Sequence, residues 1–468
     1  MKKKPILSLT LAATLSIGTL GTGATFAKPM DSVQAPPIHV VDHKVINKIS
    51  AENIYQTIKH LSQQPRVAGT ESEDQAVQYI KEKFESYGYD TEIQEFTFVG
   101  YTAPHTVELS IDGSDEEFQP ETFTYTVSGE VTGGLTYAGL GTKDDVESVD
   151  LTGKIALIKR GSITFAEKVL NAAEKGAVGV IIYNNAEGSL SGTLGEASED
   201  YVPAVSVTKA QGEALTAKLE NGESLTATIN VQGASTGEKT SHNVIATKEP
   251  TKPTRANDDY IMVVGSHHDS VAGAPGANDD ASGTAMTLEL ARVYKDLPTD
   301  TELRFVTFGA EEIGLLGSSH YVASLSDDEI NRTVANFNLD MVGSKDAGDL
   351  VMRTLDGEPN LVTHLAQASS KRLNGVATSY GQGGRSDHVP FAEAGIPAAL
   401  FIHSPTEPWY HSPEDTIDKI SKEKLQDVAE IVGGAIYYVA KFDSMGPKPK
   451  APKKQKAEQE LYHEQNMK

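Results

Sequence analysis

Five residues of types that commonly bind metal ions are spread through the second half of this 468-residue chain. They are two histidines and three carboxylates, namely His267, Asp279, Glu312, Asp340 and His411. Imidazole nitrogens and carboxylate oxygens are typical ligands of zinc. This set suits two zinc ions that share one bridging carboxylate and keep open positions for water and a substrate. A fourth acid, Glu311, stands beside Glu312 and remains available to accept a proton from such a water.

The most concentrated signal lies in residues 263–285, VVGSHHDSVAGAPGANDDASGTA. Taken alone it is weak, because a single histidine is more often structural and an Asp-rich loop is more often a solvated turn. Three later apolar runs, however, end in GAEEIGLLGS, DMVG and HSPTEPWYHSPEDT, which bring the remaining acids and the second histidine. The same arrangement at four strand ends is what favours a metal site.

The polar segments follow short apolar runs that are typical of buried β-strands. These runs cover residues 261–265, 303–308, 334–339 and 397–402, and helical patterns begin near residues 282, 317, 361 and 421. Such alternation predicts an α/β fold with a mostly parallel central sheet covered by helices on both faces. Ligands of these sheets bind beyond the carboxyl ends of the strands, so the fold would gather the metal-binding residues at one edge.

A separate β-rich region is expected between residues 101 and 236. Helical patterns at 50–63 and 71–87 and a strand at 91–98 open the α/β domain before it. The segments GKIALIKRG, FAEKVLNAAEKGAVGVIIYNN and VPAVSV resemble the protease-associated domain, a module inserted in several exopeptidases. The alternative is a decorated extension of the first sheet. An inserted domain predicts a discontinuous catalytic domain made of residues 28–100 and 237–444.

The two ends of the chain have compositions of their own. Residues 1–27 combine three lysines, an apolar segment and a small-residue cleavage site, which predict a secretory signal peptide and an extracellular protein. The alternative, a membrane anchor, needs about 20 apolar residues, more than this segment has. Residues 445–468 are rich in Lys and Pro and predict a disordered tail, with a cationic tether to an anionic cell-wall polymer as the alternative.

Charge and cysteine content narrow the set of partners. The formal net charge is −24, and removal of the three lysines in residues 1–27 would take it to −27. An acidic surface argues against nucleic acid and anionic membranes as partners. It leaves room for loosely bound Ca²⁺ at positions that the sequence does not identify. The chain has no cysteine, so core packing and bound metals must stabilise it without disulfides.

Five motifs resemble one enzyme family in order and in context. GSHHDS, GANDDASGTA, AEEIGLLGS, NLDMVG and YHSPEDT are similar to those of the secreted co-catalytic di-zinc aminopeptidases of the leucyl aminopeptidase type. The resemblance covers about residues 50–98 and 240–442. It implies a zinc exopeptidase fold and peptide substrates with a free N-terminus. It favours Leu, Arg or Lys as the residue removed, without deciding among them.

The resemblance also implies how the metal ions are held. His267 and Asp340 would bind one zinc ion, and Glu312 and His411 would bind the other. Asp279 would bridge the two ions. The peptide bond that follows the bridging aspartate is typically cis in this family, which implies a cis bond between residues 279 and 280.

Three further residues receive roles from the same resemblance. Glu311 would act as the general base that takes a proton from the zinc-activated water, and would later protonate the leaving amine. Tyr410 would stabilise the oxyanion that develops on the substrate. Asp269 would orient His267 through a hydrogen bond to its second ring nitrogen.

Two other functions compete with an aminopeptidase. One is a di-zinc carboxypeptidase of the glutamate-releasing type, which also carries a protease-associated domain. It would need cationic side chains to hold a substrate carboxylate, and Arg385 is the candidate that the sequence offers. The other is a non-catalytic binding protein with a peptidase fold. Such proteins lose metal ligands, whereas all five candidates and Glu311 are present here.

Overall fold

The computed structural model describes residues 26–27, 42–112, 116–251 and 260–441. The expected signal peptide lies outside the described residues except for its last two, and the Lys- and Pro-rich segment 445–468 lies wholly outside them. No helix among the described residues is both long enough and apolar enough to cross a membrane.

The larger of two sheets has nine strands. They are β1 (Phe26–Ala27), β2 (Asp90–Thr102), β11 (Ser235–Lys248), β12 (Ile261–His267), β13 (Glu302–Phe308), β14 (Thr333–Leu339), β15 (Asp349–Thr354), β16 (Ser379–Gln382) and β17 (Ala398–Ser404). Their order is β1-β16-β15-β17-β14-β12-β13-β11-β2. The central strands β17, β14, β12 and β13 pair in parallel, whereas β11 and β15 pair antiparallel with β13 and β17. The predicted parallel sheet is therefore present at the centre.

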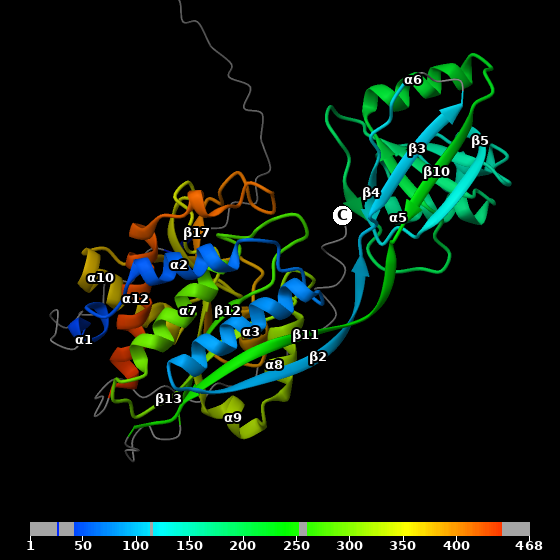
Figure 1. Cartoon of the computed structure of the whole chain (residues 1–468). Helices are drawn as coiled ribbons and strands as arrows, with labels where there is room; N and C mark the ends of the chain where they lie inside the picture. The colour runs from blue at the N-terminus through cyan, green and yellow to red at the C-terminus, as the bar shows by residue number, and fades with distance from the viewer. Residues whose placement is uncertain (1–25, 28–41, 113–115, 252–259, 442–468) are drawn as a thin grey trace, which may run out of the picture.

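Helices cover both faces of this sheet because its central strands are apolar on both sides. Along β12, Met262 and Val264 belong to one buried cluster, whereas Ile261 and Val263 belong to another on the opposite face. The first face carries α1 (Asp42–Ile46), α2 (Ala51–Leu61), α3 (Glu71–Ser86), α7 (Ala281–Tyr294), α10 (Leu361–Asn374) and α12 (Lys422–Ala440). The second carries α8 (Leu316–Ser324), α9 (Asp327–Arg332) and α11 (His388–Glu393) (Figure 1).

Local capping sets where the helices beside the sheet begin. Oγ of Ser50 accepts a hydrogen bond from the backbone N–H of Asn53 at 3.2 Å, so α2 begins directly after residue 50. Oδ1 of Asp280 accepts one from the backbone N–H of Gly283 at 2.8 Å and starts α7. Because β12 ends at residue 267 and α7 begins at residue 281, residue 279 lies in the loop beyond the carboxyl end of β12.

A second sheet is built from the residues between β2 and β11. Its strands are β3 (Thr106–Asp112), β4 (Glu121–Thr124), β5 (Gly129–Tyr137), β6 (Ile155–Lys159), β7 (Gly179–Tyr183), β8 (Gly192–Thr193), β9 (Ala204–Val207) and β10 (Thr226–Gln232). Within it, β5, β6, β7 and β9 are adjacent and parallel. Its helices are α4 (Lys143–Glu147), α5 (Phe165–Glu174) and α6 (Lys209–Glu220).

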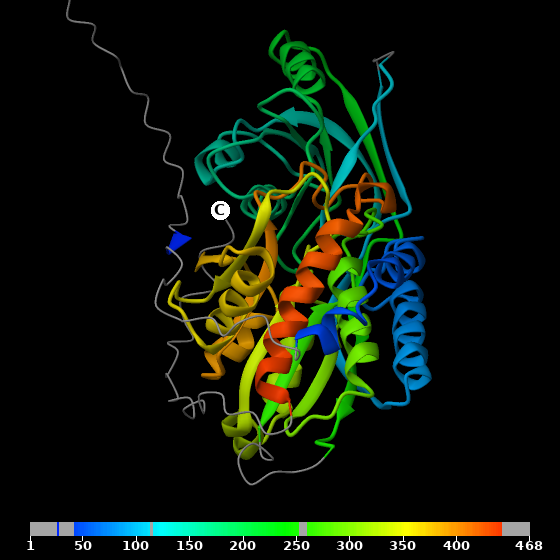
Figure 2. The same ribbon diagram turned by 90° about the vertical axis from the view of Figure 1, so that its left-hand side faces the viewer.

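The long strands β2 and β11 join the two sheets. They pair antiparallel from Asp90 with Thr247 to Thr102 with Ser235. In Figures 1 and 2 this ribbon runs from the edge of the first sheet to the second sheet, which lies to one side. The chain therefore leaves the first sheet along β2 and returns along β11.

Candidate active site

The five predicted metal-binding residues come together at the carboxyl edge of the central strands. His267 is the last residue of β12, and Asp340 directly follows β14. Asp279, Glu312 and His411 lie in the loops after β12, β13 and β17. These strands are neighbours and parallel, so their loops meet on one side of the sheet. Residues far apart in the sequence become neighbours for this reason.

The side chains form two groups around Asp279. Nε2 of His267 lies 3.2 Å from Oδ1 of Asp279 and 3.6 Å from Oδ1 of Asp340. Nε2 of His411 lies 3.2 Å from Oδ2 of Asp279 and 3.0 Å from Oε2 of Glu312. In a tetrahedral zinc site with bonds of about 2.0 Å, ligand atoms are about 3.3 Å apart. Both groups are close to this spacing, and each uses a different oxygen of Asp279.

Charge and unpaired atoms also fit a cation in each group. Burial acts to lower the pKa of His411, but contacts with Asp279 and Glu312 outweigh it and raise the pKa to about 10. The pKa of His267 is likewise raised, since the surrounding carboxylates outweigh its burial. Oε1 of Glu312 and Oδ1 of Asp340 are buried without a hydrogen-bond partner. The site therefore favours positive charge at both histidines, and its donors fit two zinc ions.

Glu311 lies beside these groups at a greater distance. Its Oε2 is 4.0 Å from Nε2 of His267, further than the oxygens of Asp279 and Asp340 that face the same nitrogen. It can still form a metal-compatible cluster with His267 and Asp340, but the longer separation favours a place next to the ions. Burial raises the pKa of Glu311 well above its ordinary value, against the effect of nearby His267. A buried carboxyl group with a raised pKa at a metal centre has the properties of a general base.

The buried carboxylate of Asp269 contacts both sides of the centre. Its Oδ1 lies 3.4 Å from Nδ1 of His267, which is where it can orient the imidazole. Its two oxygens also accept hydrogen bonds from the backbone N–H groups of Glu311, at 3.1 Å, and Glu312, at 3.2 Å. The second pair of contacts was not predicted. Through them, one carboxylate positions a histidine and the paired glutamates together.

Two buried aspartates that the sequence analysis did not assign hold the backbone of the centre. The two oxygens of Asp415 accept hydrogen bonds from the backbone N–H groups of Asn278, at 2.8 Å, and Asp279, at 3.0 Å. Asp280 accepts hydrogen bonds from backbone N–H groups at the end of β12, in the loop after β14 and in α7. The peptide bond between Asp279 and Asp280 is cis, as the resemblance implies. Asp415 lies within the motif YHSPEDT, which was the available signal.

Tyr410 lies at the solvent side of the centre. Its ring stacks on that of His411, with centroids 3.7 Å apart and an interplanar angle of 24°. The residue remains 47% exposed. Partial burial and the nearby carboxylates, Asp279 first, raise its pKa. The hydroxyl group therefore stays protonated at neutral pH and is able to donate a hydrogen bond.

The segment 385–388 contributes one exposed and one buried charged group. Arg385, the cation that a carboxypeptidase would need, is exposed. Asp387 is fully buried, and the hydroxyl group of Ser318 is close enough to favour its ionised form. Burial raises its pKa to about 7. The sequence analysis assigned no role to Asp387, because its position next to the centre depends on packing of α11.

Comparison with known proteins identifies the family. The model of Peptidase family M28 matches residues 243–436, and the model of the PA domain matches residues 126–215. Aminopeptidase YwaD of Bacillus subtilis (strain 168) is 40% identical over 465 residues, which cover 97% of each protein. The chain belongs to peptidase family M28. It is a metallo-aminopeptidase of that family and carries a PA domain, in agreement with the motifs.

Solved structures share the architecture of this M28 peptidase. An aminopeptidase from Aneurinibacillus sp. strain AM-1 is 58% identical, with a TM-score of 0.73, covering 88% of this chain and 99% of that one. BSAP, a zinc aminopeptidase from Bacillus subtilis, is 39% identical, with a TM-score of 0.68, covering 87% and 98%. The predicted fold class, a zinc exopeptidase fold with a protease-associated domain, is confirmed.

Proposed function

We propose that this M28 peptidase is an extracellular di-zinc aminopeptidase that removes single residues from the N-termini of peptides. The observation that carries the proposal is the position of Asp279, whose two oxygens each lie 3.2 Å from a different imidazole nitrogen. A carboxylate placed in this way suits two metal ions that share it. The relative BSAP, described as a zinc aminopeptidase, supports zinc as the metal.

The proposed ligands follow the two groups. His267 and Asp340 would hold one ion, Glu312 and His411 would hold the other, and Asp279 would be shared by both. When bound, two zinc ions would supply Lewis-acid polarisation of the substrate carbonyl and would lower the pKa of a water molecule. The hydrogen bonds under the ligands keep the donors in place.

Glu311 is proposed to transfer the protons. As a base it removes a proton from the attacking water, whose oxygen forms a bond to the scissile carbonyl carbon. The same carboxyl group then gives this proton to the leaving nitrogen as the carbon–nitrogen bond breaks, which returns it to the carboxylate. The hydroxyl group of Tyr410 donates a hydrogen bond to the carbonyl oxygen as negative charge develops there.

Electrostatics favour a substrate with a free N-terminal ammonium group. The carboxylate of Glu311 lies beside the group formed by His267 and Asp340, and buried Asp387 acts electrostatically on Glu311. Such surroundings attract an ammonium group and repel a substrate carboxylate. Since Arg385 is exposed, this charge distribution supports aminopeptidase polarity over carboxypeptidase polarity.

Location and residue preference belong to the proposal as well. The composition of residues 1–27 supports secretion. Leu, Arg and Lys are the proposed N-terminal residues. Leu is supported by a relative from Aspergillus oryzae that is named probable leucine aminopeptidase 2. That protein is 32% identical over 349 residues, which cover 71% of this chain and 68% of that protein. Bound Ca²⁺ and a cell-wall tether in residues 445–468 stay predictions.

The test uses arylamides of Leu, Arg and Lys, each with its N-acetylated counterpart, and measures zinc on the same protein sample. We expect hydrolysis only of the free-amine substrates and about two zinc ions per chain, as the five-ligand site implies. Silence on these substrates at full zinc content, with release of C-terminal residues from peptides, would instead show carboxypeptidase polarity. Absence of zinc from an active protein would contradict the metal assignment.

A further inference from the structure

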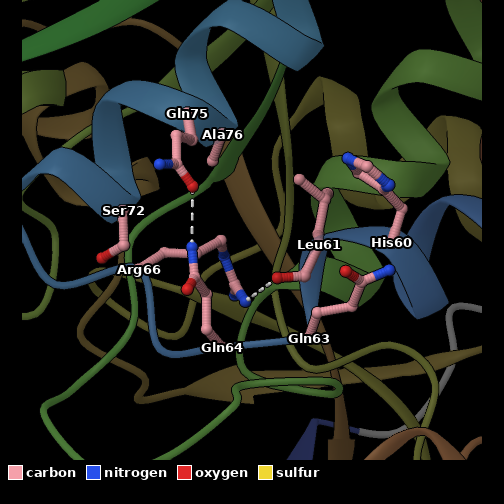
Figure 3. Close-up of a pocket in the computed structure, with 8 residues that line it drawn as sticks. All are labelled: His60, Leu61, Gln63, Gln64, Arg66, Ser72, Gln75 and Ala76. Atoms are coloured by element: carbon pink, nitrogen blue, oxygen red, sulfur yellow. Dashed lines mark hydrogen bonds between the residues drawn. The ribbon is translucent and has the colours of Figure 1, made fainter.

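Arg66 is a buried arginine to which the proposed reaction assigns no step. Only 1% of its surface is exposed, and it ranks among the largest fully buried side chains of the described residues. Figure 3 shows it at a pocket of about 340 Å³ that is otherwise lined by residues of α2, of α3 and of the turn between them. A buried guanidinium is costly unless its donors are paired. Its hydrogen-bond partners therefore indicate its purpose.

The guanidinium of Arg66 binds backbone oxygens only. It donates to the carbonyl groups of His268 (2.7 Å, from Nε), Leu61 (3.0 Å, from Nη1), Pro275 (2.7 Å, from Nη1) and Gly276 (2.9 Å, from Nη2). Three of these carbonyls belong to the loop that begins after His267 and ends before Asp279. We call residues 268–276 the metal loop, because they lie in the sequence between the proposed ligands His267 and Asp279. Carbonyl groups from both ends of this loop thus bind the side chain of Arg66.

The backbone of Arg66 binds the same loop. Its N–H donates to Oγ of Ser270 at 2.9 Å, and its carbonyl accepts from the N–H of Ser270 at 3.1 Å. At Gly276 the backbone of the loop comes so close to Arg66 that a side chain would not fit. A Cβ atom there would lie 2.9 Å from Nη2 of Arg66 and 2.3 Å from the carbonyl oxygen of Asp279. With φ at +61°, this position also favours glycine. The loop is therefore held against Arg66 with no spare room.

Arg66 also places a permanent positive charge under the acidic centre. The charges of Asp269, Asp280, Asp415 and Asp279 all act on it. A guanidinium remains protonated at any pH at which the protein is folded. Its charge therefore favours the ionised carboxylates whether or not a metal is bound.

We propose that Arg66 is a positioning residue that holds the metal loop in its metal-binding conformation before zinc arrives. The proposal rests on the two-zinc site described above. Only a planar fork with several N–H donors can span carbonyl groups from separate segments, and the single ammonium group of lysine cannot reproduce it. Loss of the guanidinium leaves all proposed ligands in the chain, but part of the free energy of zinc binding would then be used to order the loop.

The test compares Arg66→Lys with Arg304→Lys as a matched control. Arg304 is also largely buried, but its partners are the side chains of Glu302 (2.6 Å), Glu329 (2.9 Å) and Tyr321 (3.3 Å), on the face of α8 and α9. Metal-free protein is titrated with zinc against a competing chromophoric chelator, and its thermal unfolding is measured. We expect Arg66→Lys to weaken zinc affinity about tenfold or more, as lost support of a metal site does. Arg304→Lys should lower thermal stability and keep wild-type zinc affinity.

A result that overturns the proposal is wild-type zinc affinity in folded Arg66→Lys, whatever its melting temperature, because the arginine would then be merely structural. If this variant does not fold, Ser270→Ala takes its place. It removes the acceptor of the Arg66 backbone N–H and the donor to the carbonyl of Ala274, and it leaves the guanidinium. It should weaken zinc affinity about threefold or more, the value of one or two hydrogen bonds. Wild-type zinc affinity in Ser270→Ala would equally overturn the proposal that Arg66 positions the metal loop. Failure of the wild-type protein to bind two zinc ions would instead contradict the proposed function.

Discussion

The two sheets of this protein both contain four adjacent parallel strands, yet only one of them builds a reaction centre. At the carboxyl edge of β12, β13, β14 and β17, buried oxygens of Glu312 and Asp340 lack hydrogen-bond partners. At the corresponding edge of the PA-domain sheet, the helices after β5, β6 and β9 each begin with a capping box, so their polar side chains are already paired. A group that is already hydrogen-bonded within its own helix cap is less available to a ligand, because binding would have to break or share that bond. Similar topology thus yields a metal centre or a scaffold, depending on which polar atoms stay unpaired.

Each edge also contains a buried cation that gathers backbone carbonyl groups. Arg66 does so for the metal loop. Lys168 does so in the PA domain, where Nζ donates to the carbonyls of Leu140 and Gly161. The two sets of loops lead into different residues, which are proposed metal ligands in one domain and helix caps in the other. Substitutions at the loops of the first edge should therefore change metal binding or catalysis, whereas those at the second edge should change stability alone.

The largest expected effect is that of Glu311→Gln. The amide keeps the size of the side chain but cannot accept the proton, so kcat should fall about a thousandfold, within the range for a lost general base. Zinc content and melting temperature should stay close to wild type. The measurement is steady-state hydrolysis of leucine arylamide with zinc determined on the same sample. Parallel loss of zinc would mean that Glu311 is a ligand.

His411→Ala should have the next largest effect. It removes one ligand of the proposed second group, so zinc content should fall from about two towards one per chain, with most activity lost, because the site depends on both ions. The remaining ion should stay bound through His267 and Asp340. Zinc titration by competing chelator distinguishes one weakened site from two. Equal loss of both ions would show that His411 supports the whole centre and does not serve one ion.

Lys168→Met tests the other side of the comparison. Methionine fills the space but leaves the carbonyls of Leu140 and Gly161 without their donor, which should lower the free energy of unfolding by about 1 to 3 kcal/mol. Zinc affinity and kcat should be unchanged, in contrast to Arg66→Lys. Denaturant unfolding with activity at saturating substrate provides both readouts. A change in kcat in Lys168→Met would mean that the PA-domain loops influence the active site at the edge of the other sheet.

The smallest expected effect is that of Thr164→Ala, which removes one capping box. Oγ1 of Thr164 accepts a hydrogen bond from the backbone N–H of Glu167 at 3.2 Å and begins α5. Its loss should cost about 1 kcal/mol of stability without an effect on hydrolysis. Thr164→Ser keeps the hydroxyl group and should restore most of the stability. Equal stability of the two variants would show that the cap contributes nothing here.

The apolar pattern of the sequence predicted the central strands, which carry the site, more reliably than the strands β15 and β16 toward one end of the sheet. The apolar runs at 261–265, 303–308, 334–339 and 397–402 all became central strands, since a strand buried on both faces needs a continuous apolar run. β15 and β16 were not predicted. β15 begins with an exposed residue and β16 has four residues, so neither shows the pattern of a buried strand.

Residue type and position at a strand end are local properties, and the sequence by itself determined them. They were enough to identify the histidines, the carboxylates, the expected metal and the family. Only the tertiary structure decided that the two oxygens of Asp279 face different histidines, that Asp415 holds the backbone beneath it, and that Arg66 gathers the metal loop. The motif YHSPEDT contains Asp415 but does not show its role, and nothing local marks Arg66, because the partners of both residues are backbone groups brought close by strand order and loop packing. Distances between segments hundreds of residues apart depend on the whole fold, and the finer arrangement of the site depends on those distances.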